Sequence, residues 1–265
     1  MQHWLKHDPL RHLAEDPRGT DALFRGDFCC SQWDDDQYMP YSLSSRNTSL
    51  PFLSALYGQL LAAYNRTRTV NVGLDEAFDL LPAPGMRRKD GLRRAYMDHL
   101  RGLHGLLQER GAKMQFWGDI VSSDPEALRQ IPPGSVLLEW GYEADSPFAQ
   151  KGAQYDQLGV RYYVCPGTSS WNSIMGRTEN ALLNIFNAAQ SAAAHGGGGL
   201  LVTDWGDNGH LQPLPSSYLG ILAAADFSWN PNPNYPSMAS PAQARLRFGD
   251  AISRLVLRDS SLTVG

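Results

Sequence analysis

The amino-acid sequence lacks several features that would assign it to a simple class. Only three of its 265 residues are cysteines (Cys29, Cys30 and Cys165), and adjacent cysteines are poor disulfide partners, so no disulfide framework is expected. The formal net charge of −4 gives no general attraction to nucleic acid or to an anionic membrane. No run of about 18 apolar residues is present, so we expect no membrane-spanning helix.

The first residues show no basic segment followed by an apolar one, so no signal peptide is expected. With so few cysteines, a reducing, cytoplasmic location is the default expectation. The hydrophobic share of 42% is high enough to bury a sizeable core, which argues against disorder of the whole chain. Self-association into a homo-oligomer is left open.

Five short runs rich in β-branched and aromatic residues predict β-strands. These runs are Thr69–Leu74, Met114–Trp117, Val136–Trp140, Val160–Cys165 and Gly199–Thr203. Residue patterns and capping signals predict helices between and around them. The predicted helices are Leu50–Arg66, Lys89–Arg110, a short helix capped by Asp124 and ending near Ile131, Asn172–His195, and a last one over 240–257.

The alternation of strands and helices, with nearly all-apolar strands, predicts a parallel sheet or a (β/α) barrel. Most of the predicted strands end in polar or aromatic residues, and in a barrel such ends converge on one mouth. No Gly-x-Gly-x-x-Gly or Walker A loop follows any strand. We therefore predict an α/β fold, a (β/α)8 TIM-type barrel, as a single domain over residues 1–265, with an irregular loop at 18–49.

Two neighbouring carboxylates, Asp75 and Glu76, directly follow the first predicted strand. Neighbours along a strand point to opposite faces, but at the end of a strand both side chains can face the barrel mouth. Two carboxylates so close together repel each other, so one is expected to keep its proton near neutral pH, as a general acid must. A solvated loop that happens to contain Asp-Glu is the structural alternative.

Four tryptophans lie at or just after predicted strand ends. They are Trp117, Trp140, Trp171 and Trp205. Any one of them fits ordinary core packing, but four at equivalent positions favour an aromatic-lined pocket. Aromatic rings stack on the C–H faces of a sugar, while Asp, Tyr and His side chains bind its hydroxyls. The pattern therefore indicates a carbohydrate site.

Asp204, Asp207 and His210 are candidate metal ligands, but no His-x-His or His-Glu-x-x-His motif accompanies them. Neither a nucleophile elbow nor a catalytic-cysteine signature occurs, which argues against acyl transfer. No metal or other cofactor is therefore expected. A metal-dependent barrel hydrolase that uses Asp119, Asp204 and His210 remains an alternative.

The run Asn71–Glu76 resembles a signature of glycoside hydrolase family 20, the β-N-acetylhexosaminidases: a short β-run, glycine, one residue, then Asp-Glu. Phe116–Asp119, Trp140–Tyr142 and Thr203–Asp207 resemble later strand ends of that family, and the similarity covers about residues 1–230. The resemblance implies that Thr69–Leu74 is strand four of the barrel. Strands four to eight would then be present and the first three missing.

The resemblance implies a retaining exo-glycosidase acting on terminal β-linked N-acetylglucosamine or N-acetylgalactosamine, with the substrate's own acetamide oxygen as nucleophile. Glu76 would be the general acid/base, and Asp75 would hold the acetamide N–H. Tyr142 or Tyr163 would donate to the acetamide oxygen. The expected substrate-binding residues are Trp117, Asp119, Trp140, Tyr142, Tyr163, Trp171, Trp205, Asp207 and His210. A non-catalytic carbohydrate-binding remnant of such a barrel is the other alternative.

Overall fold

The structure, a computed structural model, describes residues 49–64, 66, 68–77, 88–207, 211–232 and 241–258. The chain divides into two compact units, the first ending at Val136 and the second beginning at Leu137. The expectations for the N-terminal 48 residues, including nearly all of the loop predicted at 18–49, lie outside the described residues. The same holds for His210.

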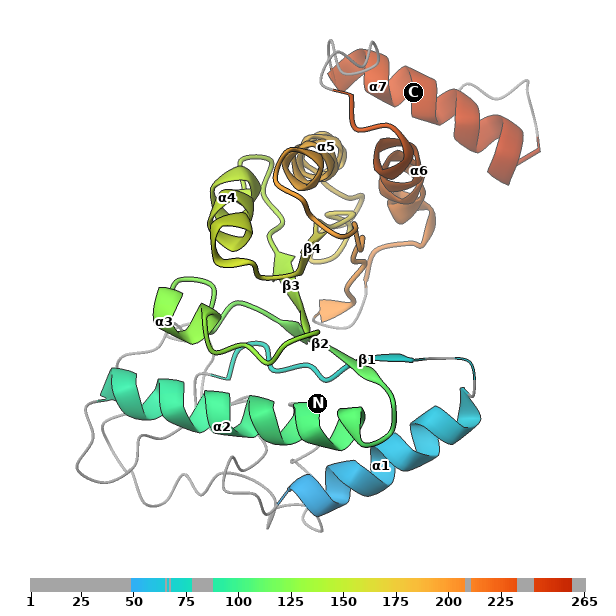
Figure 1. The fold of residues 1–265 in the computed structure, drawn as a ribbon. Helices are drawn as coiled ribbons and strands as arrows, with labels where there is room; N and C mark the ends of the chain where they lie inside the picture. Colours follow the sequence, from blue (N-terminus) through green and yellow to red (C-terminus); the bar gives the residue numbers. More distant parts are fainter. Residues whose placement is uncertain are drawn as a thin grey trace, which may run out of the picture. The chain divides into compact units, whose positions relative to one another are not determined.

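The described part of the first unit contains two parallel strands that pair with each other and helices that pack beside them (Figure 1). Its elements are α1 (Leu50–Ala63), β1 (Thr69–Asn71), α2 (Arg88–Gln108), β2 (Lys113–Trp117) and α3 (Pro125–Leu128). In the strand pair Val70 lies opposite Met114. Helix α2 packs against both α1 and β2. The face of α2 that does so buries Tyr96, Leu100, Leu103 and Leu107, which recur every three or four positions.

Helix α1 is shorter than predicted and ends at Ala63 rather than Arg66. Leu53 and Tyr57 are buried, whereas Leu60 is 41% exposed. Helices α1 and α2 approach each other closely. Gly102 of α2 permits this approach, since a Cβ atom there would lie 2.8 Å from a methyl group of Leu50.

The second unit also contains one regular pair of parallel strands. Its elements are β3 (Val136–Trp140), α4 (Phe148–Leu158), β4 (Tyr162–Cys165), α5 (Thr178–Ala194), α6 (Pro215–Trp229), α7 (Pro241–Ala251) and the π-helical turn η6 (Ile252–Val256). Leu138 lies opposite Tyr163 in the strand pair. Helix α5 contacts α4, α6 and α7. A core at the junction of α5, α6 and α7 buries Leu182, Ile185, Phe227 and Phe248.

The fifth predicted strand, Gly199–Thr203, is not a regular strand. It pairs in parallel with β4 and the loop after it through two isolated bridges, Val164 with Leu200 and Gly167 with Thr203. Between the two bridges lies Pro166, which has no N–H to donate to a ladder. The segment therefore has the expected direction and neighbour without a continuous ladder. The α/β character and the parallel pairing predicted from the sequence are confirmed.

The helices of the second unit differ from the prediction in three ways. Helix α5 begins at Thr178 rather than Asn172, because Asn172 and Gly176 have left-handed φ values of 54° and 85° that break a helix. Helices α4 and α6 were not predicted. The helix predicted at 240–257 is α7 followed by η6. None of the helices in the described part of the chain combines the length and the apolar character that a bilayer span requires.

The predicted cap of α3 is confirmed. Asp124 Oδ1 accepts hydrogen bonds from the N–H groups of Glu126 at 3.0 Å and Ala127 at 3.3 Å. Its other oxygen, Oδ2, pairs with Arg93 Nη1 at 3.3 Å. One carboxylate thus starts the helix and ties it to α2.

Asp124→Ala removes both interactions, and we expect the free energy of unfolding to fall by about 1–2 kcal/mol, the usual cost of losing an N-cap. Asp124→Asn keeps an acceptor for the helix N–H groups and should lose less. Urea denaturation measures both changes. Glu109→Ala, at a position whose side chain is 75% exposed, is the control. If Asp124→Ala is as stable as the unaltered chain, the cap does not contribute.

Candidate active site

The chain leaves β1 through a tight turn that carries Asp75 and Glu76. Asn71 Oδ1 accepts a hydrogen bond from the N–H of Gly73 at 2.9 Å. Gly73, Leu74 and Glu76 have φ values of 81°, 79° and 50°. For residues other than glycine such a backbone costs about 1–3 kcal/mol each, persists only where other contacts hold it, and clusters at functional sites. The turn that carries the two carboxylates is therefore strained, and contacts with the rest of the protein must hold it in this conformation.

Asp119, in the loop after β2, holds this turn in place. Its Oδ2 accepts a hydrogen bond from the N–H of Glu76 at 2.9 Å. The N–H of Trp117 donates to the carbonyl oxygen of Gly73 at 2.9 Å. The end of β2 thereby fixes the backbone on both sides of Asp75. The sequence indicated Asp119 as a sugar-binding residue, or as a metal ligand in the alternative hydrolase, and both roles stay predictions.

Two aromatic residues lie near these carboxylates. The Tyr96 hydroxyl donates to the carbonyl oxygen of Trp117 at 3.3 Å. Burial raises the pKa of Tyr96 well above its ordinary value, and the negative charges of Asp119 and Asp75 raise it further, so Tyr96 is a neutral phenol. The Trp117 side chain is packed in the core, with only 8% of the residue exposed. Its predicted contact with a sugar stays a prediction.

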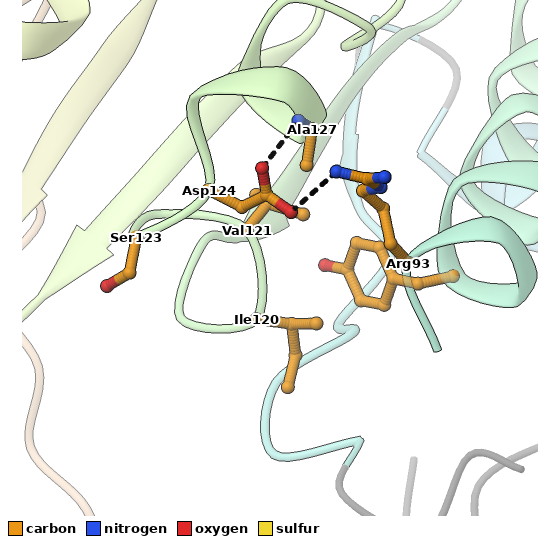
Figure 2. A pocket seen from close by; sticks show the side chains of 7 residues that line it. Arg93, Ile120, Val121, Ser123, Asp124 and Ala127 are labelled. Carbon is orange, nitrogen blue, oxygen red and sulfur yellow. Dashed lines mark hydrogen bonds and ion pairs between the residues drawn. The ribbon is translucent and has the colours of Figure 1, made fainter. Parts of the chain in front are cut away.

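A pocket of about 210 Å³ lies beside α2 in the first unit (Figure 2). Its lining consists of Arg93, Tyr96, Ile120, Val121, Ser123, Asp124 and Ala127. The two charged residues of the lining form an ion pair with each other at 3.3 Å. None of the site residues predicted from the sequence lines this pocket. The candidate carboxylates are therefore not part of it.

In the second unit, Tyr142 is the centre of a group of aromatic rings, here called the ring cluster: Trp140, Tyr142, Trp171 and Trp205. The ring of Tyr142 stacks on Trp140 with centroids 5.2 Å apart. It meets Trp171 edge-on at 4.9 Å. Trp205 Nε1 donates a hydrogen bond to the Tyr142 hydroxyl at 2.8 Å. Three of the four tryptophans predicted to line a site thus converge on one tyrosine.

The ring cluster depends on a glycine and remains partly open to solvent. A Cβ atom at Gly167 would lie 2.3 Å from the ring of Trp171 and 3.0 Å from that of Tyr142, so only glycine fits beneath them. Trp205 is 36% exposed, and the other three rings are half-buried. Burial raises the pKa of Tyr142 above its ordinary value, although hydrogen bonds from Trp205 and Thr203 oppose this. Tyr142 is therefore a neutral phenol that can donate its proton in a hydrogen bond.

Two other predicted site residues of the second unit are described, and neither is one of the rings of this cluster. Tyr163 lies within β4, and its ring packs against Gly198 and Gly199, where an added Cβ would come within 3.0–3.2 Å of it. Of the two tyrosines left open by the sequence, the ring cluster contains Tyr142. Asp207 is exposed, and its negative charge raises the pKa of Tyr142 slightly further.

A row of asparagines on α5, missed in the sequence, positions the loop that carries Tyr142. Asn180 Nδ2 donates to the carbonyl oxygen of Tyr142 at 2.6 Å. Asn184 Nδ2 donates to the carbonyl oxygens of Gly141 at 3.0 Å and Glu143 at 2.7 Å, while its Oδ1 accepts from the N–H of Gly167 at 3.0 Å. Asn187 binds the carbonyl oxygens of Ala144 and Ser146 in the same way. The signal was visible as asparagines at helical spacing in an Ala-rich helix.

Asn184→Ala would leave three backbone groups of two loops without their partner. Buried groups without a hydrogen bond cost about 1–3 kcal/mol each, and partial rehydration reduces the sum, so we expect a loss of about 2–4 kcal/mol in unfolding free energy. Urea denaturation measures it, with Gln190→Ala on the same helix as the matched control. A loss no greater than that of the control would show that α5 does not hold the loop.

Of the three residues of the metal alternative, Asp119 and Asp204 are described and His210 is not. Among the residues that the structure describes, no three His, Cys, Asp or Glu side chains gather as a metal site. Asp204 Oδ1 instead accepts hydrogen bonds from three hydroxyl groups. The Cys165 thiol is buried, and burial raises its pKa, which makes it a poor nucleophile.

Comparison with known proteins gives a likeness of fold. No protein-family model matches the chain, and no curated protein sequence is detectably similar to it. The β-N-acetylhexosaminidase from Bacteroides fragilis NCTC 9343 matches with a TM-score of 0.52 and 14% identity, over 81% of this chain and 44% of that one. The described fold is distantly similar to that of a β-N-acetylhexosaminidase.

Two further structures match less closely. A glycoside hydrolase family 20 β-N-acetylglucosaminidase has a TM-score of 0.48 at 14% identity, over 79% of this chain and 45% of its own. The family 20 β-N-acetylhexosaminidase from Streptomyces coelicolor A3(2) has a TM-score of 0.34 at 18% identity, over 48% and 22%. This chain spans less than half the length of each of these three structures.

Proposed function

We propose that the chain acts as a β-N-acetylhexosaminidase, a retaining exo-glycosidase that releases terminal β-linked N-acetylglucosamine or N-acetylgalactosamine. The observation that carries the proposal is the Asp75–Glu76 turn, in which a strained backbone held by Asp119 presents two carboxylates after a parallel strand. The fold likeness to the Bacteroides fragilis enzyme supports it. We further propose that residues 1–265 form a single partial (β/α)8 barrel domain, with β1 to β4 and Gly199–Thr203 as strands four to eight.

Glu76 is the proposed general acid/base. As the acetamide oxygen of the substrate attacks C1, the bond from C1 to the glycosidic oxygen breaks, and Glu76 gives its proton to the departing oxygen. Water then attacks C1, Glu76 takes a proton from it, and the acetamide is restored. The side chain of Glu76 is exposed while its backbone N–H is fixed by Asp119, so a substrate can reach a positioned acid.

Asp75 is the proposed partner of the acetamide. Positive charge grows on the acetamide as the oxazolinium-like intermediate forms, so an ionised carboxylate that accepts its N–H stabilises the transition state more than the ground state. Asp75 is half-buried, which strengthens such an interaction relative to bulk water.

The ring cluster is the proposed carbohydrate-binding surface of the second unit. Rings of this kind stack on the C–H faces of sugars. An indole N–H can only donate, so the Tyr142 oxygen accepts from Trp205 and keeps its own proton for a carbohydrate oxygen. Trp117, Asp119, Tyr163, Asp207 and His210 are further proposed substrate-binding residues.

Glu76→Gln tests the acid directly. Removing a general acid should lower kcat by about 10²–10⁴-fold on an alkyl N-acetyl-β-glucosaminide, whose leaving group needs the proton. The loss should be much smaller for the 4-nitrophenyl glycoside, whose leaving group departs without help. Steady-state kinetics on both substrates give the comparison, with Glu109→Gln in the same unit as the control.

Equal losses on the two leaving groups would contradict the role of Glu76. An unaltered chain that binds N-acetylglucosamine but releases no 4-nitrophenol would instead support the non-catalytic carbohydrate-binding alternative.

A further inference from the structure

A cluster of hydroxyl groups surrounds one carboxylate oxygen in the second unit, and the function proposed above makes no use of it. Asp204 Oδ1 accepts hydrogen bonds from Thr168 Oγ1 at 2.6 Å, Ser170 Oγ at 2.7 Å and Ser217 Oγ at 2.9 Å. The three hydroxyl residues are at most 2% exposed. These four residues are called the Asp204 cluster below.

The carboxylate is the strongest acceptor in this cluster. Each hydroxyl has a single proton, and hydrogen bonds to an ionised group are stronger than those between neutral groups, so the protons turn toward Asp204. The hydroxyl oxygens also approach one another, Ser170 Oγ lying 3.0 Å from Thr168 Oγ1 and 2.9 Å from Ser217 Oγ. Asp204 thus joins the loop after β4, the end of the Gly199–Thr203 segment and the first turn of α6.

The Asp204 cluster directly adjoins two tryptophans along the chain. Ser170 precedes Trp171, and Asp204 precedes Trp205. Trp171 meets Tyr142 edge-on, while Trp205 donates to the Tyr142 hydroxyl. The hydrogen bond between Ser170 and Asp204 therefore ties together the two backbone positions from which these rings reach Tyr142.

We propose that Asp204 is a positioning residue whose carboxylate holds Trp171 and Trp205 against Tyr142, and so keeps the ring cluster in the arrangement proposed to bind sugar. The effect on sugar binding rests on the proposed function, whereas the effect on the rings does not. On the proposed function these rings contact the sugar, so the loss of the Asp204 carboxylate weakens sugar binding.

The first experiment observes the rings themselves. The contribution of Trp205 to the near-ultraviolet circular dichroism is the difference between a chain and the same chain with Trp205→Phe. Asp204→Ala should abolish this difference and leave the far-ultraviolet spectrum unchanged. Asp204→Asn keeps an oxygen acceptor at the same place and should retain most of the difference. Asp145→Ala, which removes an exposed carboxylate of the same unit, is the control.

A milder variant decides the matter if Asp204→Ala loses its far-ultraviolet spectrum. Ser170→Ala removes only the hydroxyl next to Trp171. The proposal requires that it reduce the contribution of Trp171, measured in the same way with Trp171→Phe. A Trp205 signal that survives in folded Asp204→Ala, or an unchanged Trp171 signal in Ser170→Ala, overturns the proposal.

The second experiment measures N-acetylglucosamine binding by calorimetry. Misplaced rings should weaken the affinity about tenfold in Asp204→Ala and much less in Asp204→Asn. Equal weakening in the two variants would contradict the positioning role. If the unaltered chain binds no sugar while the Trp205 signal falls as expected, the proposed function fails and the positioning of the rings stands.

Discussion

Loops that follow parallel strands leave the hydrogen-bond ladder, so their backbone N–H and C=O groups need other partners. Both the Asp75–Glu76 turn and the ring cluster depend on such partners. In the first unit the partner is Asp119, which takes the N–H of Glu76. In the second it is the asparagine row of α5, of which Asn184 alone binds groups of two loops. The polar side chains that hold these loops determine where the carboxylates of the first unit and the rings of the second can lie.

Local patterns in the sequence account for the strands, the Asp124 cap and the strand-end tryptophans, because β-branched runs and capping residues act over a few positions. Helices α4 and α6 lacked such a signal. The buried Phe148 and Tyr155 of α4 stand seven positions apart among polar residues, and α6 begins in a segment rich in proline and serine. The run Gly199–Thr203 by itself predicts a regular strand. Pro166, on the opposite segment, interrupts its pairing with β4.

The partners of the polar residues could not be predicted, since they are distant in the chain. Asp204 was interpreted as a candidate metal ligand, yet two of its hydroxyl donors precede it by 34 and 36 residues. Asp119 and the N–H of Glu76 are 43 residues apart. Only the fold brings such groups together. By contrast, the convergence of Trp140, Trp171 and Trp205 follows from their shared position at strand ends, which the sequence does show.

We propose that the carboxylates of the Asp75–Glu76 turn act together with the acetamide of the substrate. The most direct test of this proposal compares kcat/KM for 4-nitrophenyl N-acetyl-β-glucosaminide and for the 4-nitrophenyl β-glucoside, which lacks that group, using the unaltered chain. A nucleophile held next to the reacting carbon can lower a barrier by about 7–11 kcal/mol, so we expect release of 4-nitrophenol from the N-acetyl substrate and almost none from the glucoside. Equal release from the two would contradict it.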